Sequence, residues 1–308
     1  MNRLNRWTGC LLAVVVLSSC VRDSLPDCPP LQVTLNVKDK NYFNADDAAK
    51  LGLLERKAED LPFRDYVHTL YYIVHDAQGN VVAEQKNTLV DNDAQTQTII
   101  LPADLPYGKY SVTVWGNMDS EEPLGDNSTD AEMEAAGAAA NDIYLVSDTL
   151  DYRYGNEMHT LGMERTKGNL LIKAEGIPDN IDFSTKSIED IYGKVDASFR
   201  YSMLTDIHTE LEWEVRNEIQ SQTLMCPSPS YEGTTLGVSF IDRSAVEPQA
   251  GSRAVATRPV LRPEDVHITM GRNEITILKY VYNSTEDGFD IFIRVNDEWE
   301  QIHAMEID

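Results

Sequence analysis

The sequence predicts an all-β protein made of two antiparallel β-sandwich domains, preceded by an export signal. Short segments in which apolar and polar residues alternate recur along the chain, and clusters of Gly, Pro, Asn and Asp separate them. This pattern is typical of antiparallel sandwiches. The length of 308 residues suggests about two domains, each large enough to bury its own core.

The N-terminus predicts export and lipidation. Arg3 and Arg6 precede an apolar run at 11–17, and two serines then lead to Cys20. A basic start, an apolar centre and a small-residue ending define a secretory signal peptide. The apolar run is shorter than the roughly 20 residues that a membrane-spanning helix needs. The ending Leu-Ser-Ser-Cys resembles a bacterial lipobox, which implies that Cys20 becomes the acylated N-terminus of the mature chain.

We expect the prolines at 26, 29 and 30 to keep the segment after Cys20 extended, because proline blocks a helix and disfavours a central strand. The chain then divides into a lipoprotein signal peptide at 1–19, a lipidated tether at 20–30, an N-terminal β-sandwich at 31–165 and a C-terminal β-sandwich at 166–308.

The N-terminal domain is expected to begin with a strand over 31–37, where apolar residues occupy every second position. The apolar segment 67–74 predicts a second strand, and the turn residues at 76–80 predict a hairpin back to 81–83. Good helix formers at 130–136 predict a short helix or, equally, an ordered loop. Further strands are expected at 96–101 and 109–115.

The C-terminal domain is expected to continue the same pattern of short strands. A turn at 176–179, with Gly and Pro, follows the first of them. The expected strands are 169–174, 188–192, 194–200, 209–215, 234–241, 274–282 and 289–295.

The charge of the chain limits its partners. The formal net charge is −25, and loss of residues 1–19 removes two arginines and no acid. Such a charge argues against nucleic acid and against electrostatic adhesion to anionic lipid. The apolar fraction of 42% argues against a disordered chain. We read the acidity as a source of solubility.

The sequence contains no recognisable catalytic set, so we expect no enzyme, no metal site and no cofactor. The six histidines form no HxH or HxxxH pair. Neither a Gly-x-Ser-x-Gly elbow nor a phosphate loop occurs. Glu210, Glu212 and Glu214 alternate on one face of an expected strand, where a solvated face explains them better than a paired carboxylate site.

Two further groups of residues have two interpretations each. Trp115, Trp213 and Trp299 fit either a sugar-stacking platform or core packing, and their strand contexts favour the core. Cys28 and Cys226 are available for a disulfide in an exported protein, and the sequence leaves their pairing open.

Five segments of the chain, taken in order, carry a family resemblance. They are Cys20 with Asp-Cys-Pro-Pro at 27–30, the hairpin with its Asp-x-x-Gly turn at 70–82, Pro-x-Gly-x-Tyr followed by Trp-Gly-Asn at 106–117, the crossing at 154–165, and the closing strand at 290–299. Together they resemble the lipid-anchored fimbrial subunits of Bacteroidales-type bacteria, the FimB-like anchor proteins related to fimbrillins.

The resemblance implies two transthyretin-like sandwiches and a pilus component without chemistry of its own. It implies assembly with pilus stalk or accessory subunits by strand exchange, in which one subunit's strand completes another's sheet. Acyl chains such as palmitate on Cys20 would hold the protein in the outer membrane, exposed at the cell surface. We expect the exchanging surface to include Phe289, Ile291, Ile293 and Val295. The alternative is a surface lipoprotein that binds glycan or host protein without polymerising.

Overall fold

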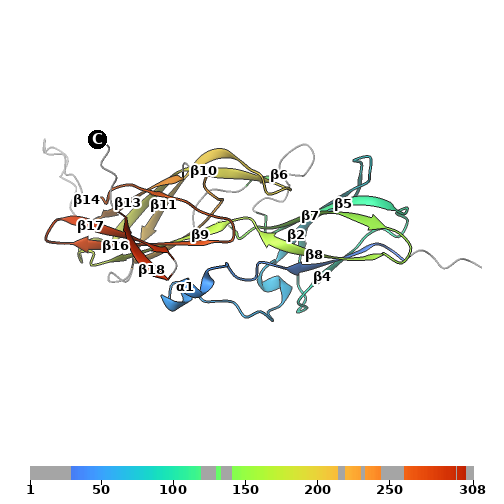
Figure 1. Ribbon diagram of the computed structural model, residues 1–308, viewed down its shortest axis with the longest axis horizontal. Helices are drawn as coiled ribbons and strands as arrows, with labels where there is room; N and C mark the ends of the chain where they lie inside the picture. Colours follow the sequence, from blue (N-terminus) through green and yellow to red (C-terminus); the bar gives the residue numbers. More distant parts are fainter. Residues whose placement is uncertain are drawn as a thin grey trace, which may run out of the picture.

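The fold is nearly all β, as the sequence predicts. The computed structural model describes residues 29–118, 130–132, 141–213, 219–229, 233–243, 260–295 and 297–302. Its strands form three sheets of seven, six and five strands. The molecule is elongated, with the seven-stranded sheet at one end and the other two sheets at the opposite end (Figure 1). The all-β prediction is therefore confirmed, while the transthyretin-like detail stays a prediction.

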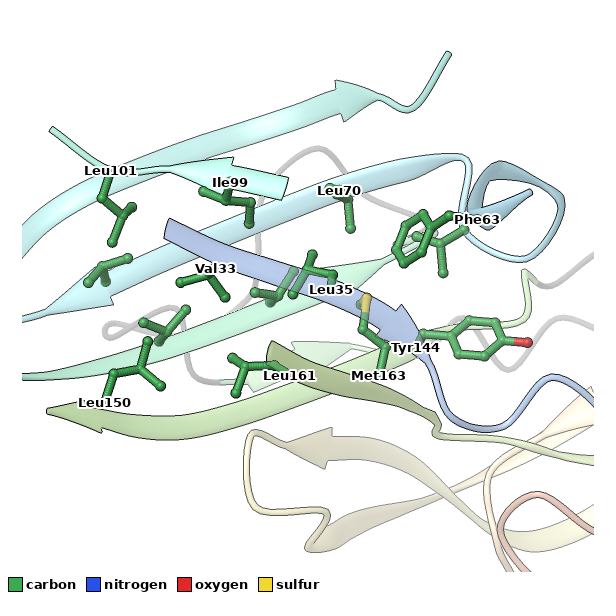
Figure 2. Packing of buried hydrophobic residues seen from close by; sticks show 14 of the residues in the cluster. Val33, Leu35, Phe63, Leu70, Ile99, Leu101, Tyr144, Leu150, Leu161 and Met163 are labelled. Atoms are coloured by element: carbon green, nitrogen blue, oxygen red, sulfur yellow. The ribbon is translucent and has the colours of Figure 1, made fainter. Parts of the chain in front are cut away.

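The N-terminal half is one curled sheet around its own core. Its strand order is β3-β2-β5-β7-β8-β1-β4. In β1 every second side chain is buried, because the alternation in Gln-Val-Thr-Leu-Asn-Val sends Val33 and Leu35 to the inner face. Figure 2 shows these two residues packing with side chains from the facing strands. The strands are β1 (Gln32–Val37), β2 (Thr69–His75), β3 (Val81–Leu89), β4 (Gln97–Ile100), β5 (Gly108–Gly116), β7 (Tyr144–Tyr152) and β8 (Met158–Arg165).

The C-terminal half consists of two sheets that enclose a second core. The six-stranded sheet has the order β11-β10-β13-β14, with β15 pairing β13 and β6 pairing β10. The five-stranded sheet has the order β12-β9-β16-β17-β18. The strands are β6 (Asp130–Glu132), β9 (Gly168–Glu175), β10 (Phe183–Asp196), β11 (Tyr201–Glu212), β12 (Ile219–Met225), β13 (Thr234–Ile241), β14 (Val260–Leu261), β15 (Val266–Ile268), β16 (Ile275–Asn283), β17 (Gly288–Val295) and β18 (Glu298–Ile302).

Two local expectations are wrong. Residues 130–132 form strand β6 and not the start of a helix, because they pair with residues 194–196 of β10. Strand β10 runs without a break through Gly193, where two separate strands are expected. Gly193 stays in the strand because it lies directly against β11, where an added Cβ would be 2.9 Å from a methyl group of Thr205.

A segment of the N-terminal half covers the C-terminal half. After β1 the chain forms helix α1 (Ala45–Lys50), which lies beside β9 and β18 in Figure 1, and then the 3₁₀ turn η1 (Phe63–Asp65). Tyr42 and Ala48 pack with Leu171 and Ile277 on the outer face of the five-stranded sheet. The side chain of Asn44 bonds both backbone groups of Ile275, donating to its carbonyl at 2.7 Å and accepting from its N–H at 2.9 Å.

The C-terminal half covers the N-terminal half in return. Val195, near the end of β10, and Cys226, after β12, pack with Tyr71 and Trp115 on the outer face of the N-terminal sheet. Cys226 is buried, and burial raises the pKa of its thiol to about 12. Cys28 lies outside the described residues. The two halves thus overlap in both directions, and the expected boundary at 165–166 stays a prediction.

Arg165 joins the two halves at the point where the chain crosses between them. Its guanidinium donates to Asp142 Oδ2 at 2.7 Å, to Tyr144 Oη at 2.6 Å and to Asn273 Oδ1 at 2.6 Å. It also stacks 4.1 Å from the ring centroid of Tyr42. Asp142 and Tyr144 belong to the N-terminal half, whereas Asn273 precedes β16 of the C-terminal half. This buried cation, which bonds residues of both halves, therefore fixes the geometry of the crossing.

A second buried cation lies inside the C-terminal core. Lys186 points inward from β10, and its ammonium donates to the hydroxyls of Ser221 and Thr223 on β12 in the opposite sheet. Burial lowers the pKa of Lys186 to about 8. Neutral hydroxyls compensate a buried charge poorly, so Lys186 makes the fold less stable when it is charged.

Replacing Arg165 is expected to destabilise the whole chain. Arg165→Met keeps the length of the side chain but removes the guanidinium that donates to Asp142 and Asn273, and should lower the free energy of unfolding by about 3 kcal/mol in urea titrations. The control is Arg153→Met, whose side chain is 70% exposed and pairs with Asp151 at 3.4 Å. That variant should change stability by less than about 1 kcal/mol. Equal effects of the two substitutions would contradict this role for Arg165.

Lys186 is expected to make the free energy of unfolding increase with pH in mildly alkaline solution. Between about pH 8 and 9 the unfolded chain keeps a proton on this lysine that the folded chain has lost, so the free energy of unfolding increases with pH in this window. Above about pH 9 the buried thiol of Cys226, whose pKa is raised to about 12, acts in the opposite direction. Lys186→Met should remove this rise and stabilise the protein at pH 7 by about 1–3 kcal/mol. Urea titrations at both ends of the window test this, with Lys109→Met, an exposed lysine, as control. A Lys186→Met variant that keeps the rise would refute the assignment.

Candidate functional site

The C-terminal half is open along one side, between the edge of its five-stranded sheet and the short strands of its six-stranded sheet. We call this opening the seam groove. It has a volume of about 470 Å³. One wall is the segment 262–267, and the other is formed by residues 286–291 and 301–302. Strands β14 and β17, which border it, lie at the end of the molecule opposite to the N-terminal sheet (Figure 1).

The groove wall formed by residues 262–267 belongs to an interrupted neighbour of strand β13. The two-residue β14 pairs with Phe240 and Ile241, and the three-residue β15 pairs with residues 234–236. Pro263 lies between them and has no N–H to donate, so it ends the pairing. Among the described residues, no strand pairs with residues 237–239 on this side of β13.

The interior of the seam groove is apolar and its rim is charged. Val266 and Ile291 are buried beneath it, at 4% and 6% exposure, and Phe289 and Ile302 are half-buried beside them. The rim carries the acidic residues Glu264, Asp265 and Glu286 and the basic residue Arg262. Such a surface suits an extended peptide, whose backbone would pair with a strand edge while apolar side chains enter the groove.

Tyr280 lies in the core behind the groove. Its ring makes edge contacts with Phe240 and Phe289, at centroid distances of 6.4 Å each. Burial raises the pKa of its phenol above the ordinary value. Its hydroxyl has no hydrogen-bond partner among the described residues, so the core here is adapted for packing and not for polar recognition.

The expected strand-exchange residues all lie on β17. Ile291 is buried, and Phe289 and Ile293 pack against the same core. Val295 is half-buried opposite Glu298. However, β17 is paired on both sides, with β16 and with β18. Of the four side chains, Phe289 and Ile291 line the seam groove, and Ile293 and Val295 lie outside its lining. The edge of the five-stranded sheet next to β17 is β18.

Strand β18 carries charges that suit an exposed edge. Glu298 and Glu300 are both exposed and alternate with Trp299. Charged residues on an edge strand discourage indiscriminate pairing with other chains. On the opposite face of β18, Trp299 packs against the sheet, and its ring centroid lies 4.6 Å from the ammonium of Lys279. Pairing along β18 would therefore need a partner with complementary charge.

Cys20, the predicted lipidation site, lies outside the described residues. The described chain begins at Pro29, whose carbonyl accepts a 2.7 Å hydrogen bond from Tyr152 Oη at the end of β7. In the part of the chain that the structure describes, no helix is long and apolar enough to cross a membrane.

The other residues singled out from the sequence do not converge on a site. Trp115 is fully buried, and Trp213 packs against Phe240 at 5.8 Å between centroids. Glu210 and Glu212 are exposed on β11, and Glu214 lies outside the described residues. Within the described ranges, no three His, Cys, Asp or Glu side chains gather in a way that could hold a metal ion.

Sequence reasoning missed the elements that make the groove. Strands β14, β15 and β18 are short, and none was expected as a separate strand. Pro263 is the signal that could have located the interruption, since it follows Leu261 and precedes the alternation of Val266 and Ile268.

Comparison with known proteins confirms the resemblance. Residues 25–161 match the family model of the fimbrillin-A associated anchor proteins Mfa1 and Mfa2. None of the curated proteins matches the chain.

Three solved structures share the fold at low sequence identity. A candidate adhesin of Bacteroides ovatus is 14% identical, with a TM-score of 0.55 and coverage of 93% of this chain and 98% of its own. The fimbrial anchor protein Mfa2 of Porphyromonas gingivalis is 12% identical, with a TM-score of 0.51 and coverage of 89% and 100%. A candidate polysaccharide-binding protein of Bacteroides thetaiotaomicron is 10% identical, with a TM-score of 0.55 and coverage of 89% and 99%.

Proposed function

We propose that this chain, which matches the fimbrial anchor family over residues 25–161, joins a cell-surface fimbrium to the outer membrane. Acyl chains on Cys20 hold one end of the molecule in the membrane. A pilus stalk or accessory subunit binds at the other end, in the seam groove, by adding a β-strand. The protein has a structural role and no catalytic one.

The observation that carries this proposal is the position of the two ends. The described chain starts at Pro29, beside Tyr152 in the N-terminal sheet. The seam groove is bordered by β14 and β17, which lie at the far end of the elongated molecule (Figure 1). An anchor needs this arrangement, because the membrane and the next subunit must be bound at opposite ends without competing for space.

Strand addition also agrees with the chemistry of the groove. Residues 262–267 lie outermost on this side of the six-stranded sheet, so a strand entering beside them would continue that sheet. Each net backbone hydrogen bond contributes about 0.5–1.5 kcal/mol, and apolar side chains over Phe289 and Ile291 add burial. In this role Phe289 and Ile291 receive a partner strand in the groove, and β17, which also carries Ile293 and Val295, does not leave its own sheet.

One observation favours a second function, the binding of glycan without polymerisation. A polar hollow of about 270 Å³ lies on the face formed by β10, β11 and β13. Hydroxyl groups of Ser187, Thr235 and Ser239 and the carboxylate of Glu189 line it. The similar protein from Bacteroides thetaiotaomicron is described as polysaccharide-binding. A glycan array on the mature chain tests this, and sugar binding without retention of pilus subunits would favour it over the anchor.

The anchor function predicts where pili are found. Cys20→Ala should prevent acylation, so electron microscopy should show long pili shed into the medium and few on cells. Cys10→Ala is the matched control, because Cys10 lies in the signal peptide that precedes the mature chain. It should leave pili attached. Unchanged, attached pili in the Cys20→Ala strain would contradict the anchor function.

Strand addition at the seam predicts a local pattern of crosslinks. A photoreactive benzoylphenylalanine at Glu264 or Gln301, exposed residues of the groove lining, should crosslink to a pilus subunit in piliated cells. The same label at Thr88, exposed on the edge strand β3 of the N-terminal sheet, should not. Crosslinking at Thr88 and not at the groove would move the binding edge to the N-terminal half.

A further inference from the structure

Four exposed apolar side chains gather at the end of the N-terminal sheet. Ile100 is 63% exposed, Tyr107 43%, Tyr154 85% and Met158 77%. We call these four residues the base patch. They come from the end of β4, the loop before β5, the turn between β7 and β8, and the start of β8. Large apolar groups gathered in this way on a surface indicate a contact site.

The base patch surrounds the point where the described chain begins. Gln32 of β1 lies between Ile100 on β4 and Met158 on β8 in the sheet register. The ring of Tyr107 contacts that of Tyr152 at 4.9 Å between centroids, and Tyr152 holds the Pro29 carbonyl. Any tether that leads into Pro29 therefore emerges among these side chains.

On the three strands β4, β1 and β8, the exposed apolar residues are confined to this end. Two residues further along the same three strands, the outward positions are Thr34, Thr98 and Thr160. The hydroxyls of Thr34 and Thr98 lie 3.3 Å apart. On these strands the outer face thus changes from apolar, at Ile100 and Met158, to polar at the next outward-facing positions. This pattern fits a partner that touches only the tip of the sheet, as a flat surface would.

The length of the tether limits how far this tip can be from Cys20. Nine peptide steps separate Cys20 from Pro29, and an extended chain of that length spans at most about 30 Å. If Cys20 carries acyl chains, as the proposed function requires, the base patch is held close to the membrane at a high effective concentration. A weak apolar contact is then sufficient for docking.

We propose that the base patch docks on the membrane surface that holds the acyl chains of Cys20. Tyrosine suits this position, because its ring is apolar and its hydroxyl remains in contact with water. The net charge of −25 gives no attraction to anionic lipid, so the contact is apolar and persists at high salt. Docking holds the long axis at a defined angle to the membrane and points the seam groove away from it.

Tryptophan fluorescence in vesicles tests the docking. The acylated mature chain, carrying Tyr154→Trp or Met158→Trp, is placed in phosphatidylcholine vesicles that contain brominated lipid, and the emission of the unsubstituted chain is subtracted. The added emission at either position should fall about twofold, because interfacial side chains lie within reach of the bromines. The control is Leu89→Trp, which is 73% exposed at the other end of the N-terminal sheet and should not be quenched.

Each outcome separates docking from the proposed function. An acylated chain in which none of the three tryptophans is quenched overturns docking and leaves the anchor intact. A blue shift at position 154 without quenching means that a second copy or another protein covers the patch, which also overturns docking. Mass spectrometry of the N-terminal peptide shows whether Cys20 carries an acyl group. If it carries none, both the proposed anchor function and the proposed membrane docking are overturned.

Discussion

The crossing between the two halves depends on one buried cation. Arg165 is 3% exposed in its side chain and donates to Asp142, Tyr144 and Asn273, which come from both halves. Because a guanidinium presents its donors in a fixed plane, satisfying these acceptors sets the angle of the crossing as well as its distance. The packing of α1 on the five-stranded sheet and of Val195 on the N-terminal sheet adds apolar contacts between the two halves.

This overlap makes the molecule suitable for transmitting force. In a chain with two independent domains, a pull on a bound subunit would first extend the linker. Here a pull between Pro29 and the seam groove is opposed by a buried ion pair, a bidentate bond from Asn44 to Ile275 and apolar clusters on both sides of the crossing. In the proposed anchor function, the load of a pilus would act along the long axis, and these contacts would resist it.

Some of these features could be predicted from the sequence and others could not. The bounds of β13 are the expected 234–241, because strict alternation gives a half-buried strand. Strand β18 was missed since glutamates hide its pattern. Strand β6 was expected to be a short helix or an ordered loop, because only its pairing with β10 makes it a strand. Nothing local marks Arg165 as special, since its partners are far apart in sequence. Cys20, by contrast, is predicted from its motif alone.

The central claim is that the two halves form a single rigid body that separates the membrane end from the seam groove. Double electron–electron resonance between spin labels at Met158→Cys and Glu264→Cys tests it most directly, in a Cys28→Ser background. Cys226 is buried, with its thiol pKa raised to about 12, and escapes labelling. We expect one narrow distance distribution in the acylated chain. A broad or bimodal distribution would show two domains that move independently, and would contradict the claim.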